Sequence, residues 1–149
     1  MRRSFLVPET LSTDRLQLRL PGADDVEAYT AMLAEPEVNR FVGGAELARA
    51  ERAFRSLGWM IGHWHLRGYG LWVVTERTTG ALVGHVGGCY PPDWPAMEIG
   101  WTLARPWWGK GYALEAALAA RAAIHACLQP ARLISLVAVD NERSANLAR

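Results

Sequence analysis

The chain has 149 residues, of which 50% are hydrophobic and 21% are charged. This length suits one domain, and the composition excludes an intrinsically disordered chain, which would need fewer apolar residues and a larger charge excess. A formal net charge of +1 argues against DNA or RNA as the main partner, because proteins that neutralise phosphates carry a stronger basic excess. We therefore expect a single domain over residues 1–149.

Cysteine and histidine spacing gives expectations about location and metals. Cys89 and Cys127 lie far apart without a Cys-x-x-Cys pair, which favours a reduced, cytoplasmic chain over a disulfide framework. His63 and His65 would not share a helix face, so no metal site is predicted. The sequence contains no apolar run of about 18 residues, so no membrane span is predicted. The N-terminal segment also lacks the apolar stretch of a signal peptide.

The first half of the chain predicts one strand and two helices. Residues 15–20 alternate polar and apolar side chains, as in a half-buried strand, and a helix capped by Asp24 or Asp25 should follow and run to about Ala34. A second helix is predicted over 45–65, although Gly58 and Gly62 weaken this prediction and could kink or break the helix. The side chains expected on its buried face are Leu47, Ala50, Phe54, Leu57 and Ile61.

The second half predicts mainly strands. Residues 70–75 and 81–90 should form an antiparallel hairpin, in which Gly87 and Gly88 indicate a bulge or a close backbone contact. The remaining elements are a strand over 97–103, an alanine-rich helix over 109–127, a strand covered on both faces over 133–139 and a helix starting near 140–144. This order predicts an α/β fold with a mixed sheet.

A glycine-containing loop joins the predicted strand 97–103 to the next helix. Gly109, Gly111 and Ala113 let the backbone approach a ligand, and the first N–H groups of a helix form an anion site suited to phosphate. Lys110, the only lysine in the sequence, adds a positive charge. The spacing excludes a Walker loop and a dinucleotide fingerprint. An ordinary strand-to-helix turn remains the alternative.

Four segments occur in order: STDRLQLRLPGADD at 12–25, EIGWTL at 98–103, RPWWGKGYALEA at 105–116 and VAVDNERSANLA at 137–148. Together they resemble the GNAT N-acetyltransferases, in the subgroup typified by ribosomal-protein N-terminal alanine and serine acetyltransferases. The resemblance implies a mixed, mostly antiparallel central sheet flanked by helices. The family's Gln/Arg-x-x-Gly-x-Gly/Ala pattern falls on 108–113, where Trp108 replaces Gln or Arg, as is frequent in the subgroup.

Similar proteins continue beyond the segment that ends at Arg149, through two further strands. The resemblance therefore implies that the last strands of the fold are missing and that the C-terminus is truncated. Such a strand edge would expose hydrogen-bonding groups and apolar surface, which favours a homodimer or another covering chain.

The resemblance implies that acetyl-coenzyme A is the cosubstrate and that acetyl passes directly to a primary amine on a protein N-terminus or a small molecule. The acceptor would lie near residues 38–44 and 90–96. The residues implied in coenzyme binding are Trp101, Thr102, Leu103, Trp108, Gly109, Lys110, Gly111, Tyr112, Ala113 and Asn141. A backbone N–H near Trp101 would stabilise the oxyanion. The alternative function is an inactive coenzyme-binding or interaction module.

Two side chains are candidates for proton transfer. Glu98 is the carboxylate of the central strand and could serve as general base, directly or through water, or could instead pair with an arginine on an open face. Strand alternation places Glu98, Gly100 and Thr102 on one face. Ser144 matches the subgroup's serine, a candidate proton donor to the thiolate, while its simpler role is a hydroxyl near an N-cap at Asn141.

Overall fold

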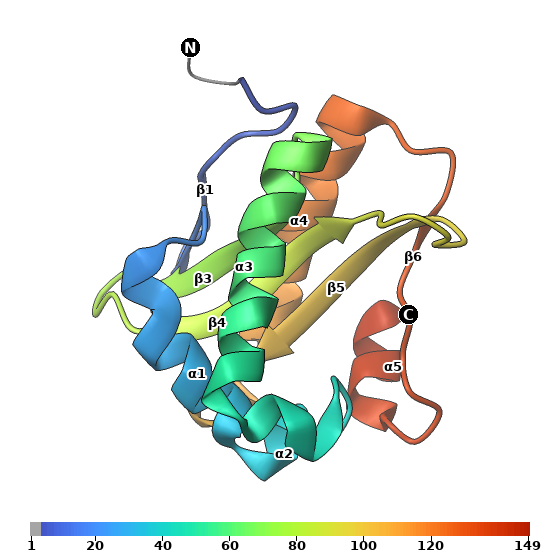
Figure 1. The fold of residues 1–149 in the computed structure, drawn as a ribbon. Coiled ribbons are helices and arrows are strands. Elements are labelled where there is room, and N and C mark those ends of the chain that lie inside the picture. Colours follow the sequence, from blue (N-terminus) through green and yellow to red (C-terminus); the bar gives the residue numbers. More distant parts are fainter. Residues whose placement is uncertain (1–3) are drawn as a thin grey trace.

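The computed structural model describes residues 4–149, which form one six-stranded sheet in the order β1-β2-β3-β4-β5-β6 (Figure 1). Neighbouring strands are antiparallel from β1 to β5, and β5 and β6 are parallel. The strands are β1 Leu11–Ser12, β2 Leu16–Arg19, β3 Leu71–Glu76, β4 Leu82–Cys89, β5 Met97–Leu103 and β6 Leu133–Ile134. The predicted mixed, mostly antiparallel sheet is confirmed.

Helices cover both faces of this sheet. The helices are α1 Val26–Ala34, α2 Pro36–Asn39, α3 Ala50–Arg67, α4 Tyr112–Leu128 and α5 Glu142–Ala148, with 3₁₀ turns at Ala23–Asp25, Gly44–Ala48 and Arg105–Trp107. Helices α1 and α3 pack on one face and α4 packs on the other (Figure 1). Alternate side chains of β3 enter the two cores, because Trp72 and Val74 join the α4 side while Leu71 and Val73 join the α1 and α3 side.

The second long helix starts later than predicted and buries only part of the predicted face. Residues 44–48 form a 3₁₀ turn, and α3 then runs through both Gly58 and Gly62. Ala53, Leu57 and Trp64 are buried along its inner face, whereas Phe54 is 61% exposed. The predicted face was therefore wrong at Phe54, because packing against α1 and β3 selected the row one position earlier.

The strand predicted over 133–139 is wrong beyond Ile134. Within residues 133–139, only Leu133 and Ile134 pair with β5, and the chain then leaves the sheet. The Ser135 hydroxyl donates to the Ile99 carbonyl at 2.9 Å, which replaces the next backbone contact of a continuing ladder. Val139 lies in solvent rather than between two layers. An apolar run can show that a segment suits a strand, but not that a partner edge is in reach.

The predicted close backbone contact at the hairpin is confirmed at Gly87. A Cβ there would lie 2.3 Å from the Gly70 carbonyl oxygen, so only glycine lets β3 and β4 approach at this point. The register shift lies elsewhere, between Val74 and Thr75. Within residues 4–149, no helix combines the length and apolar character needed to cross a bilayer.

Candidate functional site

Two adjoining cavities lie beside the C-terminal half of β5. The loop groove, about 900 Å³, is lined by the end of β5, the loop before α4 and helix α5. The inner pocket, about 520 Å³, is lined by α1, α3, β4, β5 and residues 135–138. The residues that line both cavities are Phe41, Val42, Trp101, Thr102, Asn141 and Ser144. The two cavities therefore meet at Trp101 and Ser144.

The loop groove presents backbone at the start of α4. Gly109 and Gly111 have φ angles of +73° and +78°, the left-handed region that favours glycine. This turn leads directly into α4, whose first N–H groups have no earlier carbonyl partner in the helix. On the groove wall, the Trp108 indole N–H donates to the Leu103 carbonyl at 2.9 Å, and the Arg143 guanidinium lies over the Trp108 ring at 4.1 Å.

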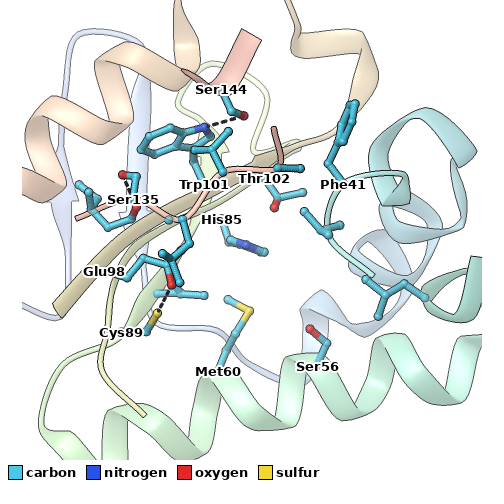
Figure 2. A pocket seen from close by; sticks show the side chains of 18 of the residues that line it. Phe41, Ser56, Met60, His85, Cys89, Glu98, Trp101, Thr102, Ser135 and Ser144 are labelled. Atoms are coloured by element: carbon cyan, nitrogen blue, oxygen red, sulfur yellow. Dashed lines mark hydrogen bonds between the residues drawn. The ribbon is translucent and has the colours of Figure 1, made fainter. Parts of the chain in front are cut away.

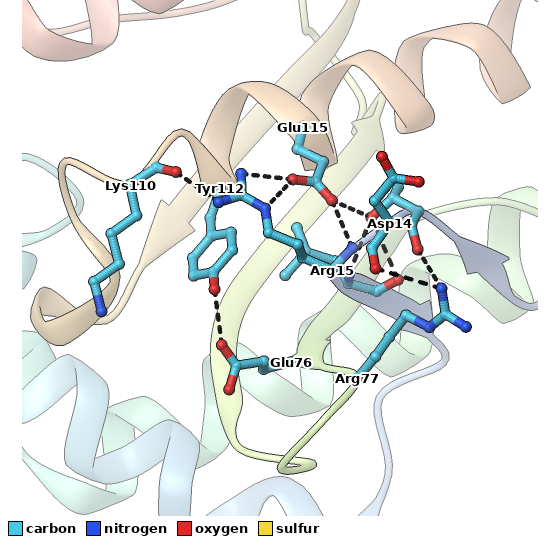
Figure 3. Close-up of polar contacts among 9 residues, drawn as sticks. Asp14, Arg15, Glu76, Arg77, Lys110, Tyr112 and Glu115 are labelled. Atoms are coloured by element: carbon cyan, nitrogen blue, oxygen red, sulfur yellow. Dashed lines mark hydrogen bonds and ion pairs between the residues drawn. The ribbon is translucent and has the colours of Figure 1, made fainter.

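An ion pair fixes the loop from behind (Figure 3). The Arg15 Nε donates to Glu115 Oε2 at 2.7 Å, while Arg15 Nη1 donates to the Lys110 carbonyl at 2.9 Å. Partial burial would raise the pKa of Glu115, but hydrogen bonds from Thr13 and Arg15 outweigh it and lower the pKa. The Tyr112 hydroxyl donates to Glu76 at 2.8 Å. Side chains from other parts of the chain therefore brace the loop.

The backbone of Trp101 is directed into the junction of the two cavities. The Ala104 N–H donates to the Val83 carbonyl, so Ala104 belongs to a hydrogen-bonded pair of the antiparallel ladder between β4 and β5. Such pairs alternate along a strand, which turns the N–H and C=O of Trp101 away from β4. The Leu103 and Ile99 carbonyls face the same way, because they accept from Trp108 and Ser135.

Ser144 lies at the same junction as an acceptor of two hydrogen bonds. The Trp101 indole N–H donates to Ser144 Oγ at 3.3 Å and the Asn141 side-chain amide donates at 3.1 Å. Asn141 is also the N-cap of α5, because its Oδ1 accepts from the Ser144 N–H at 3.3 Å. Since Oγ accepts twice, its own hydrogen is left to point toward another acceptor.

Glu98 lies in the inner pocket (Figure 2). Its Oε2 accepts from the Trp94 indole N–H at 2.8 Å and from the Cys89 thiol at 3.6 Å. Among residues 4–149, no ion pair joins Glu98 to an arginine. The alternative, in which Glu98 pairs with an arginine on an open face, is therefore wrong for these residues. Burial, aided by the Glu98 charge, raises the pKa of Cys89 to about 12, so the thiol stays protonated and donates.

A second polar group forms the floor of the inner pocket. The Tyr29 hydroxyl lies 3.1 Å from Ser56 Oγ and 3.3 Å from His85 Nδ1. Burial lowers the pKa of His85 to about 4, so its ring is neutral near pH 7. Sequence reasoning missed Tyr29, Ser56 and His85. The available signal was a lone histidine within the apolar strand 82–89.

The predicted site residues divide between the cavities. Every residue predicted for coenzyme binding lines the loop groove except Lys110, whose ammonium lies 5.2 Å from the Trp107 ring. Ser144 lines both cavities, and Glu98 lines only the inner pocket. The expected alternation of β5 is confirmed by the α4-side core, which takes Ile99 and Leu103 but not Glu98, Gly100 or Thr102. All of residues 98–102 line the inner pocket. Among the described residues, no three metal-ligating side chains gather.

The sequence and the fold match a known protein family. The acetyltransferase (GNAT) domain family matches residues 15–149. The chain belongs to the GNAT acetyltransferase family.

Individual relatives agree with this membership. The chain is 34% identical over 118 residues to the uncharacterized protein YkkB of Bacillus subtilis, an alignment that covers 73% of this chain and 64% of that protein. A crystal structure of an acetyltransferase from Agrobacterium tumefaciens is 32% identical, with a TM-score of 0.85, over 99% of this chain and 84% of that one.

A more distant structure shares the fold. It is RimL, the ribosomal L7/L12 alpha-N-protein acetyltransferase, in complex with coenzyme A. Its TM-score is 0.75 at 18% identity, over 95% of this chain and 79% of that one.

Proposed function

We propose that residues 1–149 form a single acetyltransferase domain that moves acetyl from acetyl-coenzyme A to a primary amine by direct attack in a ternary complex. One observation carries the proposal: a groove with helix N–H groups and an open strand edge meets a pocket with a carboxylate, at Trp101 and Ser144. The groove would take the coenzyme and the inner pocket the amine. The acceptor is a protein N-terminus or a small amine.

The groove suits a long ligand that begins with phosphates. The backbone N–H groups of 109–113 can receive pyrophosphate, since glycines at 109 and 111 leave the backbone accessible and the helix dipole favours an anion. The outward-facing C=O of Trp101 can accept from an amide N–H of such an arm, as it would from an added strand. Relatives of this fold bind coenzyme A, as the RimL complex does.

The junction suits acyl transfer. The coenzyme supplies the activated thioester. Glu98 would take a proton from the incoming ammonium, either directly or through water, a role that typically contributes 10²–10⁴-fold. The Trp101 N–H would stabilise the oxyanion on the acetyl carbon, worth about 3 kcal/mol for one preorganised donor. The amine nitrogen bonds to the acetyl carbon, the carbon–sulfur bond breaks, and the nitrogen loses its second proton to solvent as the amide forms. The Ser144 hydroxyl gives its proton to the departing thiolate and is reprotonated from solvent.

Thermal melting and thiol release together test the proposal. Acetyl-coenzyme A in excess should raise the melting temperature, because a ligand that binds only the folded state stabilises it. Addition of a primary amine should then release free thiol. A shift without thiol release for any amine would favour the inactive coenzyme-binding module, and no shift at all would contradict a coenzyme site.

A further inference from the structure

The inner pocket carries one formal charge. Among residues 4–149, Glu98 is the charged side chain that lines it, and no lysine or arginine lines it. His85 is neutral near pH 7 and the Cys89 thiol is protonated, so neither adds charge. The pocket therefore attracts an ammonium group and has no cation to neutralise a carboxylate on the same molecule, which would have to be buried unpaired.

The polar groups around Glu98 are already partnered. Tyr29 bonds to both Ser56 and His85, and Glu98 accepts from Cys89 and Trp94. A peptide brings an N–H and a C=O at every residue, and each would lose water without a partner here. One ammonium beside Glu98 needs no further donors or acceptors from the pocket floor. The occupant is therefore a molecule with few polar groups besides its amine.

Apart from the hydroxyls of Thr102, Ser135 and Ser144 and the Asn141 amide, the rest of the wall is apolar and rich in aromatic rings. These rings come from four separate elements or loops, and Figure 2 shows Phe41 above and Met60 below the level of His85, on different sides of the pocket. Trp59 and Trp94 line the pocket yet are 45% and 38% exposed, so part of each ring is open to an occupant. The volume of about 520 Å³ lies within the usual range for small-molecule sites.

We infer that the acceptor is an arylalkylamine: a primary amine on a short chain with an aromatic ring and no acidic group. The inference rests on the proposed acetyl transfer. The ring would pack among Phe41, Trp59 and Met60, and the ammonium would lie beside Glu98 and the Trp94 ring, where carboxylate and aromatic face both favour a cation.

A matched series of amines tests this inference by thiol release from acetyl-coenzyme A. Phenethylamine, phenylalaninamide and phenylalanine share the ring and the amine and differ only at the α-substituent. We expect kcat/KM for phenethylamine to exceed that for phenylalanine at least tenfold, with phenylalaninamide between them. Basicity cannot explain the slower reaction of phenylalanine, because its α-amine is less basic than the amine of phenethylamine and loses its proton more readily.

Two substitutions at partly exposed positions of α3 test the effect of adding a positive charge to the pocket. Trp59→Arg would place a cation at the pocket, and Phe54→Arg is its control, because Phe54 is 61% exposed and does not line the pocket. The ratio of phenethylamine to phenylalanine kcat/KM should fall at least tenfold in Trp59→Arg and stay unchanged in Phe54→Arg.

Acetyl transfer and the class of acceptor can be refuted separately. Equal or faster thiol release with phenylalanine, or with a peptide N-terminus such as Ala-Ala-Ala-amide, would overturn the arylalkylamine inference and leave acetyl transfer standing. Absence of thiol release with every one of these amines, despite a coenzyme-induced rise in melting temperature, would overturn both. An equal fall of the ratio in both arginine variants would show that the inner pocket does not set the preference.

Discussion

The loop groove and the inner pocket are built in opposite ways. The groove depends on backbone groups of a short continuous segment, 101–114, whose shape follows from two glycines and a helix start. The inner pocket depends on side chains brought together from α1, α3, β4 and β5. A site built from backbone groups tolerates most side-chain substitutions but is disrupted when its glycines are replaced. A site built from side chains loses one functional group with each substitution. This contrast makes the two cavities separable by mutation.

The largest expected effect is at the carboxylate of the inner pocket. Glu98→Gln keeps an oxygen acceptor for the Trp94 indole but cannot take a proton. We expect kcat/KM to fall about 100-fold, with a flatter pH profile, and the coenzyme Kd to stay unchanged. Steady-state kinetics and calorimetric titration measure both quantities. Glu46→Gln, an exposed carboxylate, is the control, and a rate within twofold of wild type in Glu98→Gln would remove Glu98 from the chemistry.

The next effect concerns the stability of the pocket floor. Because burial lowers the pKa of His85 to about 4, the unfolded chain binds a proton below about pH 6.5 while the folded chain does not. Stability is therefore full above pH 6.5 and decreases as the pH falls toward 4. Between pH 7 and pH 5 the linkage predicts a loss of about 2 kcal/mol from this group.

Urea unfolding at both pH values measures that loss. His85→Gln should reduce the difference by roughly this amount. Burial also lowers the pKa of His63, which adds a loss of the same sign that is common to both proteins. An unchanged difference in His85→Gln would show that His85 is not protected from protonation.

A pair of glycines tests the groove alone. Gly109 and Gly80 both have a φ of +73°, and a Cβ at either would meet open space. Valine at each position should therefore lower the free energy of unfolding equally, by about 1–2 kcal/mol. Only Gly109→Val should weaken acetyl-coenzyme A binding, by about tenfold or ~1.4 kcal/mol, because only that turn presents N–H groups to the groove. Equal coenzyme affinity in the two variants would show that the loop at Gly109 does not bind the coenzyme.

The smallest expected effect is at the junction of the two cavities. Ser144→Ala removes the hydroxyl that accepts from Trp101 and Asn141 and would protonate the thiolate. We expect kcat to fall about fivefold, near the ~1 kcal/mol of one hydrogen bond, with the amine KM unchanged. Ser56→Ala removes a hydroxyl from the pocket floor and is the matched control. A larger loss in Ser56→Ala than in Ser144→Ala would reverse the assigned roles.

Sequence reasoning reached the groove more completely than the pocket. The loop around Gly109 and Gly111 could be predicted because turn and helix-start chemistry is local in the sequence. The approach of Tyr29 to His85 joins residues 56 positions apart and depends on how α1 packs on β4. The exposure of Phe54 on α3 and the short β6 were mispredicted for the same reason, since neighbouring elements decided both. Phe41, Val42 and Trp94 do lie within the two segments expected to form the acceptor side.

The early departure of β6 from β5 has a consequence for backbone dynamics. An N–H that faces a gap instead of a strand exchanges its hydrogen with water quickly, while its neighbours within the ladder between β4 and β5 exchange slowly. Protection along β5 should therefore alternate, with fast exchange at Trp101 and slow exchange at Thr102. Any molecule that pairs with this edge would slow exchange at Trp101 and remove the alternation. The hydrogen-exchange rate of the Trp101 amide therefore reports whether the junction is occupied.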